Sequence, residues 1–142
     1  MHIRELIARN QHAIISASSS DSVRDAARLL AEKRIGALPV LDGDRLVGIF
    51  SERDVIYGLA ADADGALDKS LADAMTLEPV TVDGGTTVLA ALSLMSRRRI
   101  RHLPVMEGDR LIGFVSIGDL VKSRIELIEA EAEAMREYIQ SV

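Results

Sequence analysis

The sequence contains the same segment twice, and this internal repeat constrains the fold more than any other feature. Residues Ile35–Ile56 align without a gap with Ile100–Val121, at an offset of 65 residues. Eleven of the 22 aligned pairs are identical, namely Ile35/Ile100, Leu38/Leu103, Pro39/Pro104, Val40/Val105, Gly43/Gly108, Asp44/Asp109, Arg45/Arg110, Leu46/Leu111, Gly48/Gly113, Ser51/Ser116 and Asp54/Asp119. A repeat of this length is a complete folding unit. Two units are too few for a solenoid, so we expect them to pack against each other about a pseudo-twofold axis.

Each unit has the pattern of a strand, a helix, two strands and a second helix. The short β-rich runs Ala13–Ala17 and Pro79–Val82 predict the first strand of each unit. Apolar residues at helical spacing predict helices that begin near Val23 and Val88. The pair Asp42-Gly43, which is Glu-Gly in the second copy, predicts a tight hairpin turn. The fold class is therefore α/β (α+β), with two β-α-β-β-α units and an extended C-terminal helix.

The boundaries between the units follow from the linker Ala60–Ala66, where small residues and aspartates interrupt the apolar pattern. We predict a first domain over residues 1–66, which includes the N-terminal segment and the linker. A second domain is predicted over residues 67–124, and a helical extension over residues 125–142.

A long helix is predicted from about Gly118 to Ile139, because apolar residues recur there at alternating spacings of four and three. This apolar seam consists of Val121, Ile125, Ile128, Ala132, Met135 and Ile139. Two interpretations are open: the seam docks onto the body of its own chain, or it pairs with a helix of a partner. The second is favoured, because the helix outlasts the repeated unit.

The composition excludes several classes of function. A net charge of −5 disfavours binding to nucleic acid and to anionic membranes, and the apolar runs are too short to span a membrane. The absence of cysteine excludes disulfides and thiolate chemistry and suits a cytoplasmic protein. The sequence contains neither a P-loop pattern nor a dinucleotide-binding glycine fingerprint, and its three histidines are scattered. We therefore expect a protein with no catalytic residues, no catalytic cofactor and no metal site.

A Gly-x-x-Ser-x-x-Asp motif ends the last strand of each unit, over Gly48–Asp54 and Gly113–Asp119. One interpretation is local, because Ser-x-x-Asp forms a capping box at the start of a helix. The other is functional: a helix N-terminus attracts phosphate, and an ionised aspartate can accept hydrogen bonds from both hydroxyls of a ribose. The glycines favour the functional interpretation, because a glycine within an apolar strand allows a flat group to approach the backbone.

These patterns resemble the cystathionine-β-synthase (CBS) domain, and their tandem arrangement resembles a Bateman module. The resemblance rests on the Pro-Val strands, the Gly-Asp-Arg turns, both Ser-x-x-Asp motifs and the lead-in segment Asp73–Thr76, and it covers roughly Ile3–Arg124. It implies clefts between the two units that bind AMP, ADP or ATP. It also implies a regulatory role towards an unknown protein target, and homodimers in which two modules form a flat disc.

The resemblance also assigns nucleotide-binding roles by position. The residues concerned are Asp54 and Asp119 for ribose, Ser51, Ser116, Arg101 and His102 for phosphate or nearby backbone, and Val80, Thr81, Ile100, Phe114, Ile15, Ser16 and Ile35 for adenine. Gly36 and Ala37 stand where the second unit has Arg101 and His102, so the first unit lacks these cations, and Arg53 is a partial substitute. We therefore hypothesise that the site containing Asp119, Arg101 and His102 binds nucleotide more tightly.

Two alternatives to an adenine-nucleotide sensor remain open. NAD(H) contains the AMP group and could occupy the same cleft. A scaffold protein with empty clefts would need the Ser-x-x-Asp motifs only as helix caps.

Overall fold

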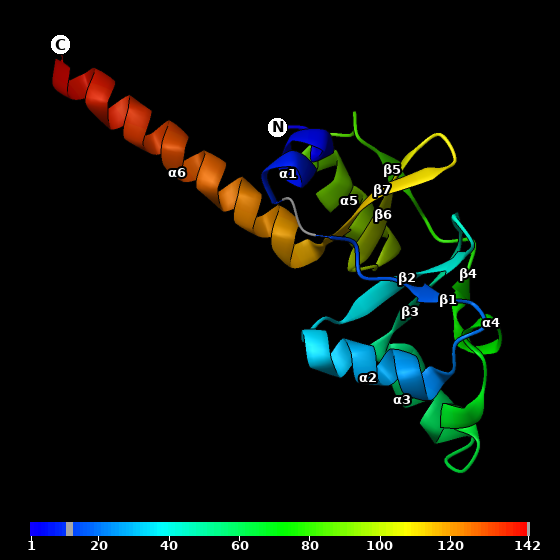
Figure 1. The fold of residues 1–142 in the computed structure, drawn as a ribbon. Helices are drawn as coiled ribbons and strands as arrows, with labels where there is room; N and C mark the ends of the chain where they lie inside the picture. Colours follow the sequence, from blue (N-terminus) through cyan, green and yellow to red (C-terminus); the bar gives the residue numbers. More distant parts are fainter. Residues whose placement is uncertain (11–12, 142) are drawn as a thin grey trace.

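The computed structural model describes residues 1–10 and 13–141, and its two sheets reproduce the sequence repeat (Figure 1). The first sheet has the order β1-β2-β3-β4, formed by Ala17–Ser18, Ala37–Asp42, Arg45–Ser51 and Thr76–Leu77. The second has the order β5-β6-β7, formed by Val82–Asp83, His102–Glu107 and Arg110–Ser116. In each sheet the first strand is parallel to the second, and the next pair is an antiparallel hairpin.

The two hairpins are equivalent residue by residue. Ala37 pairs with Ser51 as His102 pairs with Ser116, and the register shifts at the corresponding place in each sheet. Both turns contain a glycine with positive φ, 64° at Gly43 and 60° at Gly108, a conformation that glycine adopts without steric cost. The predicted repeat and both predicted hairpins are therefore confirmed.

Six α-helices are present in the described part of the chain. They are α1 (Ile3–Asn10), α2 (Val23–Lys33), α3 (Glu52–Ala61), α4 (Leu71–Ala74), α5 (Val88–Arg98) and α6 (Ile117–Ser141), with a short 3-10 helix, η1, over Ala66–Asp68. The predicted long C-terminal helix is confirmed: α6 is a single rod of 25 residues, whose first turns pack on the body and whose later part projects from it (Figure 1). The predicted α/β fold of two units with an extended final helix is thus the observed one.

The first strand of each unit is shorter than predicted. The run Ala13–Ala17 pairs only from Ala17, and the run Pro79–Val82 pairs only from Val82. The residues before these positions instead line the space between the two units, where Ile14, Ile15 and Val80 are found. β-Propensity identified these segments correctly as extended chain, but their side chains face a cleft rather than a sheet core.

Each unit is covered by a segment that precedes the other unit in sequence. Ile3 and Leu6 of α1 lie in the core of the second sheet, with Leu103 and Val105. Leu71 of α4 lies in the core of the first sheet. Leu6 and Leu71 are themselves 65 residues apart, so the repeat extends to these covering segments. The covering segments therefore tie the two units together.

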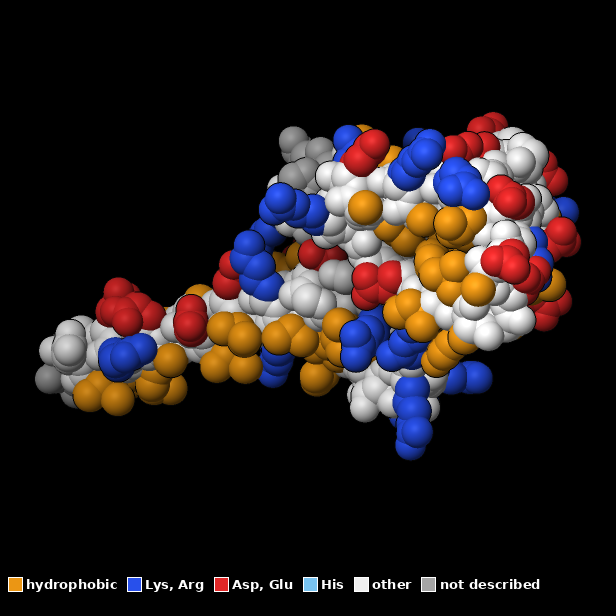
Figure 2. Space-filling view, turned by 90° about the horizontal axis from the view of Figure 1, so that it is seen from below, with side chains coloured by type: hydrophobic (Ala, Val, Ile, Leu, Met, Phe, Trp, Pro, Cys, Tyr) orange, Lys and Arg blue, Asp and Glu red, His pale blue; other side chains and the backbone are white. Residues whose placement is uncertain are grey.

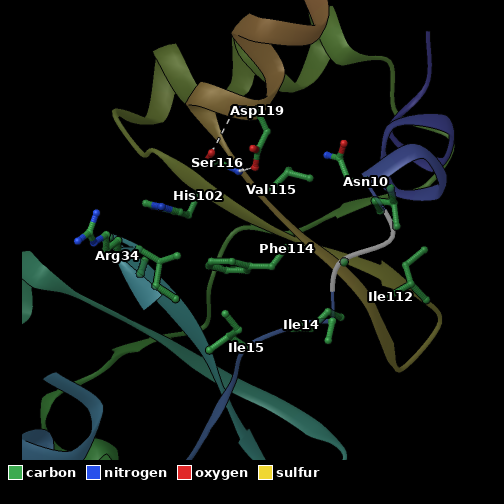
Figure 3. Close-up of a pocket in the computed structure, with 16 residues that line it drawn as sticks. Asn10, Ile14, Ile15, Arg34, His102, Ile112, Phe114, Val115, Ser116 and Asp119 are labelled. Atoms are coloured by element: carbon green, nitrogen blue, oxygen red, sulfur yellow. Dashed lines mark hydrogen bonds between the residues drawn. The ribbon is translucent and has the colours of Figure 1, made fainter. Parts of the chain in front are cut away.

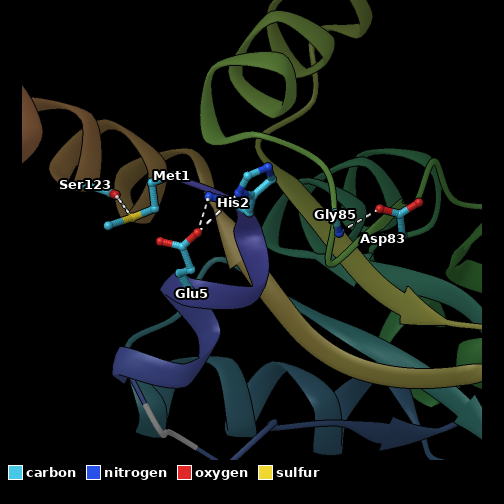
Figure 4. Close-up of polar contacts among 6 residues, drawn as sticks. All are labelled: Met1, His2, Glu5, Asp83, Gly85 and Ser123. Carbon is cyan, nitrogen blue, oxygen red and sulfur yellow. Dashed lines mark hydrogen bonds and ion pairs between the residues drawn. The ribbon is translucent and has the colours of Figure 1, made fainter.

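Polar contacts hold α1 in place (Figure 4). The buried Ser123 hydroxyl of α6 donates to Met1 Sδ at 3.1 Å. His2 Nδ1 lies 3.2 Å from Glu5 Oε1, and this side-chain hydrogen bond lowers the pKa of Glu5. In the adjacent loop before α5, Gly85 N donates to Asp83 Oδ1 at 2.9 Å. Ile3 N donates to the carbonyl oxygen of Thr86 in this loop at 2.9 Å. The N-terminus is thus anchored on the second unit by this backbone bond and on α6 by Ser123.

Candidate functional site

Two clefts of equal size each contain one of the repeated aspartates. Each has a volume of about 370 Å³, within the range of roughly 300–1,000 Å³ that is typical of small-molecule sites. We name them the Asp119 cleft and the Asp54 cleft. Each aspartate lies in the first turn of a helix, α6 and α3 respectively, so both clefts adjoin a helix N-terminus with its partial positive charge.

The Asp119 cleft combines the start of α6 with extended chain from the first unit. Figure 3 shows Asp119 and Ser116 on one side of it and Phe114 and Ile15 on the other. Arg34, the residue that ends α2, lies at one end of the cleft. The site therefore has an acidic and polar side, an apolar side and one arginine.

The Asp54 cleft has the same plan with the units exchanged. The start of α3 supplies Ser51 and Asp54, and the second unit supplies Val80 and Ile100. This cleft is richer in charge: its lining includes Arg53, Arg99 and Arg101 together with Glu52, Asp54 and Glu78. Its lining thus has three arginines and three carboxylates, where the Asp119 cleft has one arginine and one carboxylate.

Both aspartates cap their helices and line a cleft at the same time. Asp119 Oδ2 accepts from Ser116 N at 2.9 Å, while Asp119 N donates to Ser116 Oγ at 3.1 Å. Asp54 Oδ2 accepts from Ser51 N at 2.9 Å and from Ser51 Oγ at 3.1 Å. The capping interpretation is confirmed, and it does not exclude ligand binding, because every one of these carboxylate contacts uses Oδ2.

The clefts are built crosswise, which corrects the grouping expected from the sequence. Arg101 lines the Asp54 cleft and not the Asp119 cleft, and His102 lines both. The Arg101 carbonyl accepts from Ile117 N at 2.8 Å, which fixes its backbone beside α6. The connection between α5 and β6 runs along the Asp54 cleft, because Arg99, Ile100 and Arg101 all line it.

The structure distributes the other candidate residues between the two clefts. The Asp119 cleft contains Ile15, Ile35, Phe114 and Ser116, and the Asp54 cleft contains Val80, Ile100, Ser51 and Arg53. Ser16 and Thr81 line neither cleft, and Ser16 instead lines a separate hollow beside the hairpin turns. Both residues directly precede the paired strand residues Ala17 and Val82, where each segment leaves its cleft and joins a sheet.

His102 forms part of the wall that the two clefts share. Its ring stacks on Phe114, with ring centres 5.6 Å apart and an angle of 13° between the planes. Burial lowers the pKa of His102 and outweighs the opposing effect of Asp119 and Glu52, while Arg101 adds to the lowering. The lowered pKa favours the uncharged form of His102, whose ring forms a stacking surface with Phe114.

Other segments of the chain approach both motif glycines closely. A Cβ atom on Gly48 would lie 2.7 Å from both Met75 Sδ and the Thr76 carbonyl oxygen. A Cβ atom on Gly113 would lie 2.5 Å from Ile7 Cδ1. A covering segment thus packs directly against each glycine, so both glycines permit the exchanged packing. Gly48 lines neither cleft, whereas Gly113 also lines the Asp119 cleft.

Arg34 and Arg99 are the main residues that the sequence analysis missed. Each is the residue that ends a helix, each has φ of 54°, and each lies in the cleft of the opposite unit's aspartate. The repeat could have identified them, since they are identical and 65 residues apart, one position before the aligned segment. Tyr57 of α3 and Asn10 of α1 also line the clefts without having been predicted.

Two observations concern other kinds of site. Within residues 1–10 and 13–141, no group of three or more histidine, aspartate or glutamate side chains is arranged to hold a metal ion. In the same part of the chain, no helix has the length and hydropathy that are needed to cross a lipid bilayer.

Comparison with known proteins identifies relatives along most of the chain. One relative is the CBS domain-containing protein CBSX3, mitochondrial, of Arabidopsis thaliana, which is 34% identical to this chain over 128 residues. The match covers 87% of this chain and 62% of the relative, so this chain spans less than two thirds of that protein. The solved structure of a putative signal-transduction protein with CBS domains from Burkholderia ambifaria is 36% identical, with a TM-score of 0.82, and the match covers 89% of this chain and 95% of that one.

A second solved structure has a ligand in its name. The structure of CBSX2 in complex with AMP is 28% identical to this chain, with a TM-score of 0.75, and the match covers 89% of this chain and 97% of that one. The family model described as "CBS domain" matches twice, over residues 3–61 and 71–126. Because these matches cover most of the chain and fall on its two structural units, this chain belongs to the CBS-domain family.

Proposed function

We propose that this chain is a cytoplasmic, non-catalytic regulatory module that binds an adenine nucleotide (AMP, ADP or ATP) in one or both clefts. In this proposal, binding acts through the arrangement of a homodimer on a protein target. One observation carries the proposal: two equivalent clefts each combine an aspartate at a helix start, an apolar wall and an arginine from the opposite unit. The AMP named in the CBSX2 structure supports this class of ligand.

The aspartates would recognise the ribose. Each Oδ2 atom accepts a hydrogen bond from the backbone N of the serine three residues earlier, and the N–O distance is 2.9 Å in both clefts. Oδ1 takes part in none of the hydrogen bonds found among the described residues, so it remains available to ribose hydroxyls. The pre-formed cap fixes the carboxylate before the ligand arrives, which reduces the entropy that binding would otherwise cost.

Arg34 and Arg99 would bind the phosphate. A left-handed conformation is costly for a residue other than glycine, by about 1–2 kcal/mol, and glycine is the usual residue at this position after a helix. This chain has arginine there in both units. Strained backbone of this kind clusters at active sites and ligand-binding sites, and both arginines line a cleft.

The two clefts would differ in affinity. Three arginines in the Asp54 cleft can donate to one phosphate, against one arginine in the Asp119 cleft, while Glu52 and Glu78 oppose this attraction. Because several arginines can together make more charge-assisted hydrogen bonds, we propose that the Asp54 cleft binds the phosphate-bearing ligand more tightly. This reverses the preference for Asp119 expected from the sequence, since that preference depended on the placement of Arg101. His102 forms a wall of both clefts, so binding in one would be sensed in the other.

Calorimetric titration with AMP, ADP, ATP, NADH and adenosine tests this proposal. We expect AMP to bind, adenosine to bind more weakly because it lacks the phosphate, and Asp54→Ala and Asp119→Ala each to remove one site. Thr87→Ala is the matched control, because it removes the capping bond from Ala90 N to Thr87 Oγ1 (3.1 Å) outside both clefts. Tight NADH binding without AMP binding would favour the NAD(H) alternative, and no binding of any of these compounds would favour a scaffold.

A further inference from the structure

The projecting part of α6 presents an apolar seam that its own chain does not cover. Every residue from Ile128 to Ser141 is exposed. The larger seam residues are 41% exposed at Val121, 50% at Ile125, 59% at Met135 and 64% at Ile139. Figure 2 shows the hydrophobic side chains along one side of the projecting helix, with charged side chains beside them. An exposed apolar stripe of this length indicates an interaction surface.

The spacing of the seam is that of a two-stranded coiled coil. With Ile125, Ala132 and Ile139 at the a positions, Val121, Ile128 and Met135 occupy the d positions. The flanking e and g positions, which face the partner's flanks, are then occupied by Lys122, Arg124, Glu129, Glu131, Arg136 and Tyr138. These flanking residues determine how two copies of the helix can pair.

The charges on the flanks favour a parallel, in-register pair of identical helices. In that arrangement a g residue faces the e residue five positions later on the partner. Arg124 then faces a Glu129, and Glu131 faces an Arg136; each pair has opposite charges and occurs twice because the two copies are equivalent. In the single chain Arg136 Nε lies 3.5 Å from Glu133 Oε2 of its own helix, and both side chains are mostly exposed, so Arg136 is free to exchange partners.

An antiparallel pair that overlaps along the whole seam brings like charges together. Val121 then packs against Ile139 of the partner in the seam. On the flanks of an antiparallel pair, e positions face e positions and g positions face g positions. Glu129 therefore faces Glu129 of the other copy, and Glu131 faces Glu131. The same arrangement also places Lys122 opposite Arg136. Because like charges at these positions are destabilising, the antiparallel arrangement is disfavoured by the same residues that favour the parallel one.

We propose that α6 forms a parallel, in-register coiled coil with α6 of a second copy of this chain. The seam covers only about two and a half heptads, so in this proposal contacts between the two bodies add to the stability of the dimer. Ile56 on α3 and Leu89 on α5, which are 61% and 57% exposed, are apolar residues that could take part in such contacts. A parallel coil relates the copies by a twofold axis along α6, so both bodies lie at the same end. This assignment goes beyond the proposed homodimer by specifying its geometry, and it does not require a nucleotide in either cleft.

Disulfide trapping in the full chain tests the geometry, because the protein contains no cysteine of its own. Met135→Cys places one thiol at a d position, where a parallel coil brings identical residues together. Ala130→Cys is the matched control on the opposite face of the same exposed stretch. We expect mild oxidation to give a covalent dimer from Met135→Cys at least ~10-fold faster than from Ala130→Cys, as expected for a linkage that needs close Cα atoms.

Charge exchange tests the pairing without a covalent bond. In one variant Glu129→Lys and Glu131→Lys make every g–e pair repulsive, and in a second variant Arg124→Glu and Arg136→Glu do the same with the opposite sign. We expect each variant alone to dimerise about 10-fold more weakly than the unchanged chain, and an equimolar mixture to form heterodimers. Three results would overturn the proposal. The unchanged chain could be monomeric, or the charge variants could fail to form heterodimers when mixed. Met135→Cys could also form a disulfide only with Ile125→Cys, as expected for an antiparallel pair.

Discussion

Arg34→Gly is the substitution that most sharply separates stability from binding in this protein. Arg34 has φ of 54°, a conformation that costs a non-glycine residue about 1–2 kcal/mol. Glycine avoids this cost but loses roughly 0.5–1 kcal/mol more backbone entropy on folding. The net expectation is a gain in stability of about 0.5–1 kcal/mol, equivalent to a rise in melting temperature of ~2–4 °C for a chain of this size.

The same substitution is expected to weaken nucleotide binding in the Asp119 cleft. A hydrogen bond to a charged group contributes about 1.5–3 kcal/mol when it is shielded from water. Because Arg34 is exposed, screening reduces the contribution to about 1 kcal/mol, or a ~5-fold loss of affinity. Calorimetry in an Asp54→Ala background isolates this cleft, and thermal unfolding measures stability. Arg34→Lys is the control, since it keeps both the charge and the backbone strain.

Two results would refute this reasoning. A loss of stability in Arg34→Gly would show that the left-handed residue is not strained. Unchanged affinity of the Asp119 cleft, together with reduced affinity of the Asp54 cleft, would show that the crosswise arrangement of the clefts is wrong.

Three further predictions concern packing and pH. Gly48→Ala should destabilise the chain by about 1–3 kcal/mol and by more than Gly113→Ala. The Cβ added at position 48 meets the Thr76 carbonyl oxygen, whereas the Cβ added at position 113 meets the movable end of the Ile7 side chain. Equal losses of stability in chemical denaturation would contradict this. Leu71→Ala should cost about 2–5 kcal/mol, because Leu71 is fully buried in the first unit's core, and a cost below 1 kcal/mol would contradict the exchanged packing. Burial lowers the pKa of His102, so the folded chain binds this proton less well than the unfolded chain. The free energy of unfolding should therefore fall as the pH drops below about 6.5. His102→Gln should reduce this pH dependence, and an unchanged pH profile would show that His102 is not the cause.

The repeat explains why so much of the fold was predictable. The hairpins at Gly43 and Gly108 and the two units follow from patterns of neighbouring residues, which act locally. The long helix follows from the four-and-three spacing from Val121 to Ile139, which has no glycine or proline to interrupt it.

What the sequence could not show is which copy contacts which. The 65-residue offset identifies equivalent residues, such as Arg101 and Gly36, but equivalence is not contact. The structure places Arg101 with Asp54, because each cleft joins the helix start of one unit to the strand start of the other. The same limit applies to Gly48, whose neighbours Met75 and Thr76 belong to the lead-in of the second unit. The left-handed conformation of Arg34 was also hidden, because glycine is the residue that normally signals it.

The most direct test of the account is the number of nucleotides bound per chain, together with its dependence on Arg101. Calorimetry of Arg101→Ala should show weakened AMP binding when Asp119→Ala leaves only the Asp54 cleft, and unchanged binding when Asp54→Ala leaves only the Asp119 cleft. The opposite pattern would contradict the crosswise construction of the clefts. Full AMP binding in the Asp54→Ala, Asp119→Ala double variant would contradict the role of both aspartates.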